Sequence, residues 1–218
     1  MTRLTAILGF FLVAGCQAAQ PLSPGNDPRS QWWELGFVEP HYMKVWVEDS
    51  SVEDINGKQF DHTGKGAASG GQPEDGAESA KGWRGVGGSG KPVIGADLPK
   101  RIFVRWQSIV EPQTYKVWID ITEQARQLML LSVMQRCPAS PDQAARYMAS
   151  IYVGMAPGGV VKVWVRDSCH NPVEVARAQA EIEPLGPSQG KNNGRYAYPV
   201  SEKSKRYIKR FGVPYGSW

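Results

Sequence analysis

Alternating apolar and polar residues predict antiparallel β-structure in the middle of the chain. Residues 102–110 and 114–121 alternate on either side of the turn Glu111-Pro112-Gln113, a pattern typical of a β-hairpin. Successive side chains of a strand point to opposite faces, so the second segment presents one apolar face and one polar face that carries a tryptophan. The apolar face comprises Tyr115, Val117, Ile119 and Ile121, and the opposite face comprises Lys116, Trp118 and Asp120.

Further strands are expected at residues 41–48, 149–155, 160–166 and 173–182, with Pro157-Gly158-Gly159 as a tight turn. Helices are expected at residues 122–136, at a short segment that starts at Ser140, and at residues 201–211. Short turns between consecutive strands disfavour parallel crossover units. The predicted fold class is α+β, mainly antiparallel β with a sandwich-like core and two or three peripheral helices.

One short pattern occurs three times, as Lys44-Val45-Trp46-Val47, Lys116-Val117-Trp118-Ile119 and Lys162-Val163-Trp164-Val165. Each copy places Lys and Trp on one face of a strand and two β-branched residues on the other. The Lys/Trp face has two interpretations: it is packed within the protein, with lysine stems lying along the rings, or it binds a partner. The candidate partner-binding residues are Trp46, Trp106 and Trp118.

Residues 57–97 contain twelve glycines and few large apolar side chains. So little apolar surface does not offset the entropy lost on ordering, which predicts a long mobile insertion. Trp83 is the exception, and it is expected to hold the insertion against the domain. Within it, Gly85, Gly90 and Lys91 have the spacing of a phosphate-binding loop, but Pro92 stands where that motif needs Ser or Thr.

The N-terminus carries an uncharged apolar run of 12 residues, from Leu4 to Gly15, preceded by Arg3. The run is too short for a transmembrane helix, which needs about 20 apolar residues, and is typical of a secretory signal peptide. Its end, Val13-Ala14-Gly15-Cys16, resembles the bacterial lipoprotein signal. That resemblance implies cleavage before Cys16 and acylation of its thiol, whereas an ordinary cleaved signal without lipid is the alternative.

The predicted organisation is therefore a lipoprotein signal peptide at residues 1–15, a lipid-anchored tether at residues 16–31, and one β-rich domain at residues 32–218. The tether is rich in Pro, Gly and Asn and is expected to hold the domain clear of the bilayer. Gln17 follows the cysteine, so the commonest inner-membrane retention signal, Asp at that position, is absent. We expect the protein at the outer membrane, facing the periplasm.

Charge and cysteine content fit this compartment. The net charge of +4 is too small to indicate a nucleic-acid partner. A basic cluster between Lys203 and Arg210 is interpreted as a solvated helix face, with an anionic lipid or acidic partner as the alternative. Cys137 and Cys169 form an even pair in an oxidising space and are predicted to form a disulfide bond, with two buried thiols as the alternative.

Catalytic signatures are absent from the sequence. It contains no G-x-S-x-G or H-E-x-x-H motif and no cysteine and histidine spacing typical of a metal site. The acidic residues Glu48, Asp49, Glu53 and Asp54 are interpreted as solvated rather than cation-binding. Glu111 and Ser108 are assigned to turn capping in preference to a polar pocket. We therefore expect neither an enzyme nor a cofactor.

Two segments resemble the bacterial lipoprotein family of domain of unknown function 2931 (DUF2931). The first runs from Leu98 to Ser108, followed by Glu111 and Tyr115; the second runs from Val153 to Trp164, followed by Glu174 and Gln179-Ala180. Trp33, Phe37 and Pro40 are similar to the opening of the family, so the resemblance spans residues 32–183. The glycine-rich insertion and the tail after Pro184 depart from it.

The family has no established activity, and some members are thought to neighbour genes for type VI secretion toxins. The resemblance implies a non-catalytic, membrane-anchored binding protein, in the form of an immunity protein that neutralises such a toxin. A structural or ligand-binding envelope lipoprotein that holds glycan, lipid or a protein subunit is the alternative.

Overall fold

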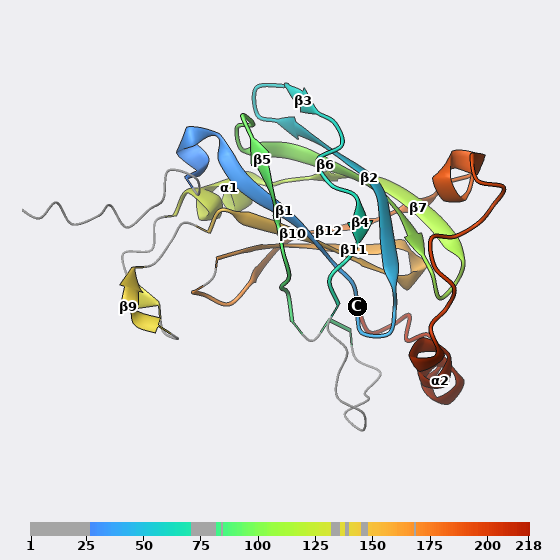
Figure 1. Cartoon of the computed structure of the whole chain (residues 1–218). Helices are drawn as coiled ribbons and strands as arrows, with labels where there is room; N and C mark the ends of the chain where they lie inside the picture. Colours follow the sequence, from blue (N-terminus) through green and yellow to red (C-terminus); the bar gives the residue numbers. More distant parts are fainter. Residues whose placement is uncertain are drawn as a thin grey trace, which may run out of the picture.

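The computed structural model describes residues 27–70, 82–83, 85–131, 136–137, 140–144, 148–167 and 169–218. The predicted signal peptide, Cys16 and most of the predicted tether lie outside these residues. The described part forms two β-sheets, a small two-stranded sheet and two α-helices (Figure 1). Almost all strand pairs are antiparallel, which confirms the mainly antiparallel α+β fold class. Among the described residues, no helix has the length and hydropathy that crossing a membrane requires.

The first sheet has the strand order β12-β11-β10-β1-β5. Its strands are β1 (Trp32–Val38), β5 (Lys91–Ile94), β10 (Ser150–Ala156), β11 (Val160–Arg166) and β12 (Val173–Gln179). The β10–β11 hairpin turns at Pro157–Gly159, where Gly158 and Gly159 both have positive φ, as expected of a tight turn. One pair, β1 with β10, is parallel. More than a hundred residues, including most of the other sheet, separate its two strands, so it is not a short crossover unit.

The second sheet has the strand order β13-β7-β6-β2-β3, with β4 also paired to β2. Its strands are β2 (Val45–Asp54), β3 (Gln59–Phe60), β4 (Gly66–Ala67), β6 (Pro99–Ser108), β7 (Gln113–Asp120) and β13 (Glu181–Ile182). The predicted hairpin is confirmed as β6–β7, in the register that pairs Phe103 with Trp118. Strand β2 starts four residues later than expected and extends to Asp54.

The two sheets face each other across one apolar core, consistent with a sandwich-like arrangement. The core contains side chains of both sheets, among them Leu35, Val45, Val104, Ile119, Ile151 and Val163. Each comes from the apolar face of an alternating strand. The apolar face of β7 points to the core as predicted: Ile119 and Ile121, which directly follows the strand, are buried, and Trp118 is exposed. Removal of these faces from water is the main favourable contribution to folding.

The segment expected to be one strand at residues 173–182 is divided between the two sheets. β12 pairs with β11 in the first sheet, whereas β13 pairs with β7 in the second. The chain changes sheets at Ala180, whose N–H donates to the carbonyl of Gly159 at 2.8 Å. The alternation of apolar residues continues across the point where the chain leaves one sheet and enters the other. The sequence pattern therefore predicts a single strand.

The helix predictions are confirmed at the C-terminus and partly wrong elsewhere. Helix α2 (Glu202–Phe211) is capped by Ser201 and ends at Gly212, as expected. Helix α1 (Glu123–Leu130) ends six residues early because Leu131 adopts an extended conformation. The helix expected to start at Ser140 is instead strand β9 (Ser140–Ala144), which pairs with β8 (Arg136–Cys137). Pairing with a neighbouring strand overrides the local capping pattern there.

The glycine-rich insertion contains more regular structure than predicted. Within residues 57–97, β3 and β4 pair with β2, and β5 forms an edge of the first sheet against β1. These short segments bury little apolar surface, and backbone hydrogen bonds to longer strands stabilise them instead. Trp83 packs against Trp164 at 5.3 Å between ring centroids, which confirms that it holds the insertion to the domain. Residues 71–81 and 84 lie outside the described part.

Candidate functional site

The three tryptophans proposed as partner-binding residues have different environments. Trp118 is 38% exposed on the outer face of the second sheet, where the Arg101 guanidinium lies 4.4 Å from its ring and Phe103 packs beside it. Trp46 is partly buried under Tyr198, with the two rings edge to face at 5.5 Å. Trp118 therefore remains the accessible candidate.

The assignment of Trp106 to a partner-binding surface is wrong. Its side chain is fully buried between the two sheets and packs against Tyr115. Trp106 lies two and four residues after Val104 and Ile102, which puts it on the same, core-facing side of β6. The alternation of apolar residues along β6 therefore already indicated that Trp106 faces the core.

A buried polar network fastens the C-terminal tail, residues 184–200, to the outer face of the second sheet. The Glu48 carboxylate accepts hydrogen bonds from Arg105 Nε at 2.9 Å, from Gln107 Nε2 at 2.7 Å and from the Ser188 backbone N–H at 2.5 Å. Gln107 Oε1 in turn accepts from the Ala197 backbone N–H at 2.7 Å. Glu48 and Gln107 are both buried. The tail is thus held at two points by side chains of β2 and β6.

The interpretation of the acidic residues of β2 as solvated is wrong. Besides Glu48, Asp54 is buried and accepts from the backbone N–H groups of Asn56 and Lys58, both at 2.9 Å. Glu53 pairs with Lys100 and Arg101, which lowers the pKa of its carboxyl group. The described residues contain no group of His, Cys, Asp or Glu side chains that could hold a metal ion. These carboxylates stabilise loops and strands.

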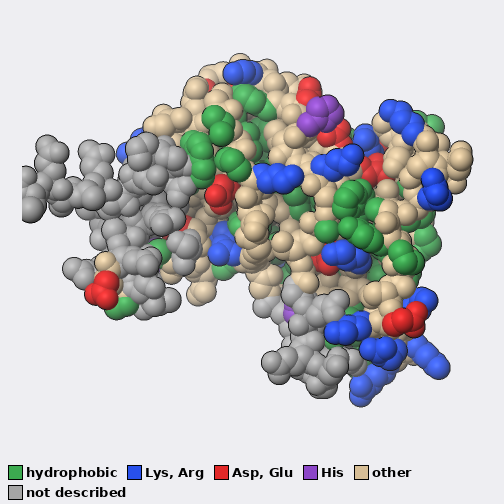
Figure 2. Space-filling model, viewed as in Figure 1, with side chains coloured by type: hydrophobic (Ala, Val, Ile, Leu, Met, Phe, Trp, Pro, Cys, Tyr) green, Lys and Arg blue, Asp and Glu red, His purple; other side chains and the backbone are tan. Residues whose placement is uncertain are grey.

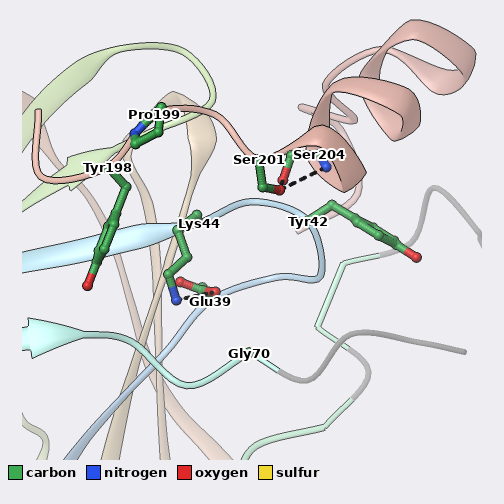
Figure 3. A pocket seen from close by; sticks show the side chains of 8 residues that line it. All are labelled: Glu39, Tyr42, Lys44, Gly70, Tyr198, Pro199, Ser201 and Ser204. Carbon is green, nitrogen blue, oxygen red and sulfur yellow. Dashed lines mark hydrogen bonds and ion pairs between the residues drawn. The ribbon is translucent and has the colours of Figure 1, made fainter.

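The tail forms one wall of a pocket of about 370 Å³, which we call the Glu39 pocket (Figure 3). The loop between β1 and β2 supplies Glu39, Tyr42 and Lys44, and the tail and α2 supply the opposite side. In Figure 3 the Glu39 and Lys44 side chains lie between the rings of Tyr198 and Tyr42. The lining residues are Glu39, Tyr42, Lys44, Gly70, Tyr198, Pro199, Ser201 and Ser204.

Glu39 is the titratable centre of this pocket. Its Oε2 accepts from the Val45 backbone N–H at 2.6 Å, and its Oε1 lies 3.4 Å from Lys44 Nζ. Burial raises the pKa of Glu39 to about 7, although the Val45 hydrogen bond and the Lys44 charge oppose the rise. Gly70 makes room for the carboxyl group, because a Cβ at that position would lie 2.3 Å from Glu39 Cγ.

Packing of α2 fixes the second wall of the Glu39 pocket. Tyr207 of α2 stacks on Tyr42 with centroids 4.6 Å apart and rings inclined by 16°. Ser201 Oγ accepts from the Ser204 backbone N–H at 3.1 Å and so caps the helix at the pocket rim. Sequence reasoning missed Glu39 and Tyr198. The one local signal is a carboxylate between the buried end of β1 and Pro40, which does not by itself indicate a pocket.

The family comparison covers nearly the entire chain. The sequence profile described as "Protein of unknown function (DUF2931)" matches residues 19–216. The chain belongs to the DUF2931 family. The match includes both the glycine-rich insertion and the tail that forms the pocket wall, beyond the resemblance at residues 32–183. No curated protein and no solved structure shows a significant match to the chain.

In this DUF2931 protein the two sequence segments that carry the family resemblance meet at one end of the sheets. The carboxylate of Glu111 accepts from the Gly158 backbone N–H at 2.9 and 3.1 Å, and Gln179 Nε2 donates to the Gly158 carbonyl at 2.7 Å. Burial, followed by the nearby Glu111 charge, raises the pKa of Tyr115. Glu111 thus caps the turn of the facing sheet, which agrees with its assignment to turn capping, and these residues join the sheets. The same assignment is wrong for Ser108, whose buried hydroxyl has no hydrogen-bond partner among the described residues.

The cysteines of this DUF2931 protein are described in part. Cys169 is disulfide-bonded, and its N–H donates to the Asp167 carboxylate at 2.7 Å. Cys137 belongs to β8, but its side chain lies outside the described part, as does Cys16. The Cys137–Cys169 bond therefore stays a prediction.

Substitution of Glu48 tests the attachment of the tail. Glu48→Ala removes the acceptor of the partly buried Arg105 side chain, the buried Gln107 side chain and the Ser188 N–H, so we expect a loss of about 3 kcal/mol in the free energy of unfolding. Limited proteolysis should cleave residues 184–200 faster than in the wild type. Glu181→Ala, at a side chain that is 74% exposed, is the control and should change neither measurement. Wild-type stability and cleavage in Glu48→Ala would contradict the proposed role.

Substitution of Glu39 tests its raised pKa. Between pH 4.5 and about 7 the folded protein keeps a proton on Glu39 that the unfolded chain releases. The free energy of unfolding should therefore fall as the pH rises through this interval, by on the order of 3 kcal/mol in total. In Glu39→Gln this contribution should be absent, as measured by urea unfolding across the interval. A pH dependence identical to that of the wild type would show that Glu39 titrates normally. Glu181→Gln should keep the wild-type profile.

Proposed function

We propose that this protein is a lipid-anchored, non-catalytic binding protein on the periplasmic face of the bacterial outer membrane, and that it holds a ligand in the Glu39 pocket. The observation that carries the proposal is the pocket itself, where a buried carboxyl group, an ammonium group and two tyrosines converge around about 370 Å³. Small ligands bind in concave sites of this size that combine a few polar groups with a perturbed pKa.

The location rests on the N-terminal sequence. The apolar run that ends at Gly15 and the following Cys16 support export and acylation. A bacterial lipoprotein with several acyl chains needs no membrane-spanning helix, because each buried methylene contributes about 0.8 kcal/mol to anchoring. A half-cystine at residue 169 agrees with an oxidising compartment.

The lining of the Glu39 pocket favours a carbohydrate. Tyr198 is 41% exposed, so its ring offers an apolar face against which the C–H groups of a sugar ring can pack. Glu39 and Lys44 supply an acceptor and a donor for sugar hydroxyls. A lipid chain is a poorer fit, because a carboxyl group and an ammonium group lie at the centre of the cavity. A cell-wall glycan is the ligand class that this lining and the proposed location share.

The arrangement supports binding without hydrolysis. Glycoside hydrolysis commonly uses two carboxyl groups about 5–9.5 Å apart, one as acid and one as base or nucleophile. Among the described residues that line the pocket, Glu39 is the one carboxylate. Its oxygens already accept from Val45 and face Lys44, so it positions a ligand in this proposal and does not activate water.

A second candidate is the immunity role that the family resemblance implies. The observation that favours it is the exposed ring of Trp118 beneath the Arg101 guanidinium, on the part of the second sheet that the tail leaves open. Trp and Arg are the residues that most often dominate binding energy at protein interfaces. A toxin would bind at this surface, away from the Glu39 pocket.

The binding of a cell-wall disaccharide tests the main proposal. The unlipidated mature chain, titrated with N-acetylglucosaminyl-N-acetylmuramic acid by calorimetry, should bind it, and Tyr198→Ala should weaken binding about tenfold by removing the packing face. Trp118→Ala is the matched control, because it removes another exposed aromatic ring outside the pocket and should leave the affinity unchanged. Absence of binding would overturn the carbohydrate assignment. Tight binding of a neighbour-encoded toxin that is lost in Trp118→Ala would support the immunity role.

Metabolic labelling tests the anchor. Cells that express the wild type with radioactive palmitate should yield a labelled protein in the outer-membrane fraction. Cys16→Ser should be unlabelled and released from that fraction, because the acceptor thiol is gone. Equal labelling of both proteins, or an unlabelled wild type, would contradict lipid anchoring.

A further inference from the structure

The excess positive charge of this protein is concentrated on one helix. Over residues 202–210, α2 carries five cationic side chains and one acidic side chain, a net charge of +4 that equals the net charge of the whole chain. The remaining residues are therefore balanced in charge. The cations are Lys203, Lys205, Arg206, Lys209 and Arg210, and all five are exposed. Figure 2 shows a group of Lys and Arg side chains at the lower right, where Figure 1 draws α2.

Helical geometry directs these charges away from the protein body. Ser204 and Tyr207 are buried, and Ile208 and Phe211 are partly buried beside them, so these four residues define the inner side of α2. At 3.6 residues per turn, Arg206, Lys209 and Arg210 fall on the opposite side, and Lys203 and Lys205 lie on its two flanks. Lys205 pairs with Glu202 at 2.8 Å, whereas Lys203, Arg206 and Lys209 make no salt bridge within the described part of the chain. A helix face that is merely solvated usually mixes charges of both signs.

The basic face is also held in a fixed orientation. The Tyr207–Tyr42 stack attaches α2 to the β1–β2 loop, and Phe211 packs on Tyr207 at 5.0 Å. Ser201 caps the first turn, and the basic residues of the last turn are favoured by the helix dipole. The cations therefore do not depend on a partner for their arrangement.

We propose that this outer face of α2 binds the anionic phospholipid surface of the membrane to which the protein is anchored. Phospholipid phosphates form a dense negative surface, and basic residues near such a surface each contribute about 1 kcal/mol to association. The charge of the face complements that surface, and the inference rests on the membrane location of the proposed function. The first described residues, 27–31, lie at the other end of the molecule from α2 in Figure 1. Contacts at both ends would bring the body against the bilayer, in place of the expectation that the tether holds the domain clear of it.

Vesicle binding tests this inference. The unlipidated mature chain should sediment with vesicles of phosphatidylglycerol and phosphatidylethanolamine, and not with vesicles of phosphatidylcholine. Binding should weaken as salt is raised, since screening acts on exposed charges. The variant K203E/R206E/K209E should bind the anionic vesicles at least about a hundredfold more weakly, because three favourable contributions are lost.

The matched control is K58E/K65E/K191E, which changes the net charge equally at exposed lysines outside α2. This variant should keep most of the affinity, and both variants should unfold at the wild-type temperature. The inference would be overturned by an equal loss in both variants, by equal binding to phosphatidylcholine, or by no binding to either vesicle. It would also be overturned if the face bound soluble polyaspartate but no vesicle, a result that indicates an acidic protein partner.

The result is separable from the tests of the proposed function. Vesicle binding by the unlipidated chain requires neither palmitate on Cys16 nor a saccharide in the Glu39 pocket. Failure of palmitate labelling would remove the proposed location even if vesicles were bound. Failure of vesicle binding with normal labelling would overturn the α2 inference alone.

Discussion

The buried carboxylate of Glu48 is the interaction on which the functional architecture depends. It brings Arg105, Gln107 and the backbone of residue 188 together at one point on the outer face of the second sheet. A buried charge is costly unless it is paired and hydrogen-bonded, so this network tolerates little displacement of the tail. Through it the C-terminal tail becomes part of the folded domain.

Both proposed binding regions follow from that attachment. The tail places Tyr198 over Trp46 and then enters α2, whose Tyr207 stacks on Tyr42. The inner side of this arrangement closes the Glu39 pocket, and the outer side presents the basic residues of α2. A ligand in the pocket and a membrane at the helix would therefore contact opposite sides of the same segment, which links the two proposals structurally without making one require the other.

Three of the residues that resemble the family connect the two sheets and do not line the Glu39 pocket. Glu111, Gly158 and Gln179 connect the β6–β7 hairpin to the turn of the β10–β11 hairpin. None of these three residues lines the Glu39 pocket. In this chain these residues thus join the two sheets. The polar and aromatic groups of the pocket come from the β1–β2 loop and the tail. Both lie outside the two segments, 98–108 and 153–164, that resemble the family.

Elements whose signals are local could be located from the amino-acid pattern. Alternation located β6, β7, β10 and β11, and the Ser201 and Gly212 signals bounded α2, because side-chain periodicity and capping depend on neighbouring residues. Three outcomes emerge from the folded chain alone: the chain changes sheets at Ala180, residues 140–144 form a strand, and the carboxylates of β2 are paired. The shared cavity of Glu39, Lys44 and Tyr198 is a further outcome of this kind. Those outcomes depend on hydrogen-bond and charge partners that are distant in the chain. The pattern of neighbouring residues does not indicate which side chain will be met across a sheet or beneath the C-terminal tail.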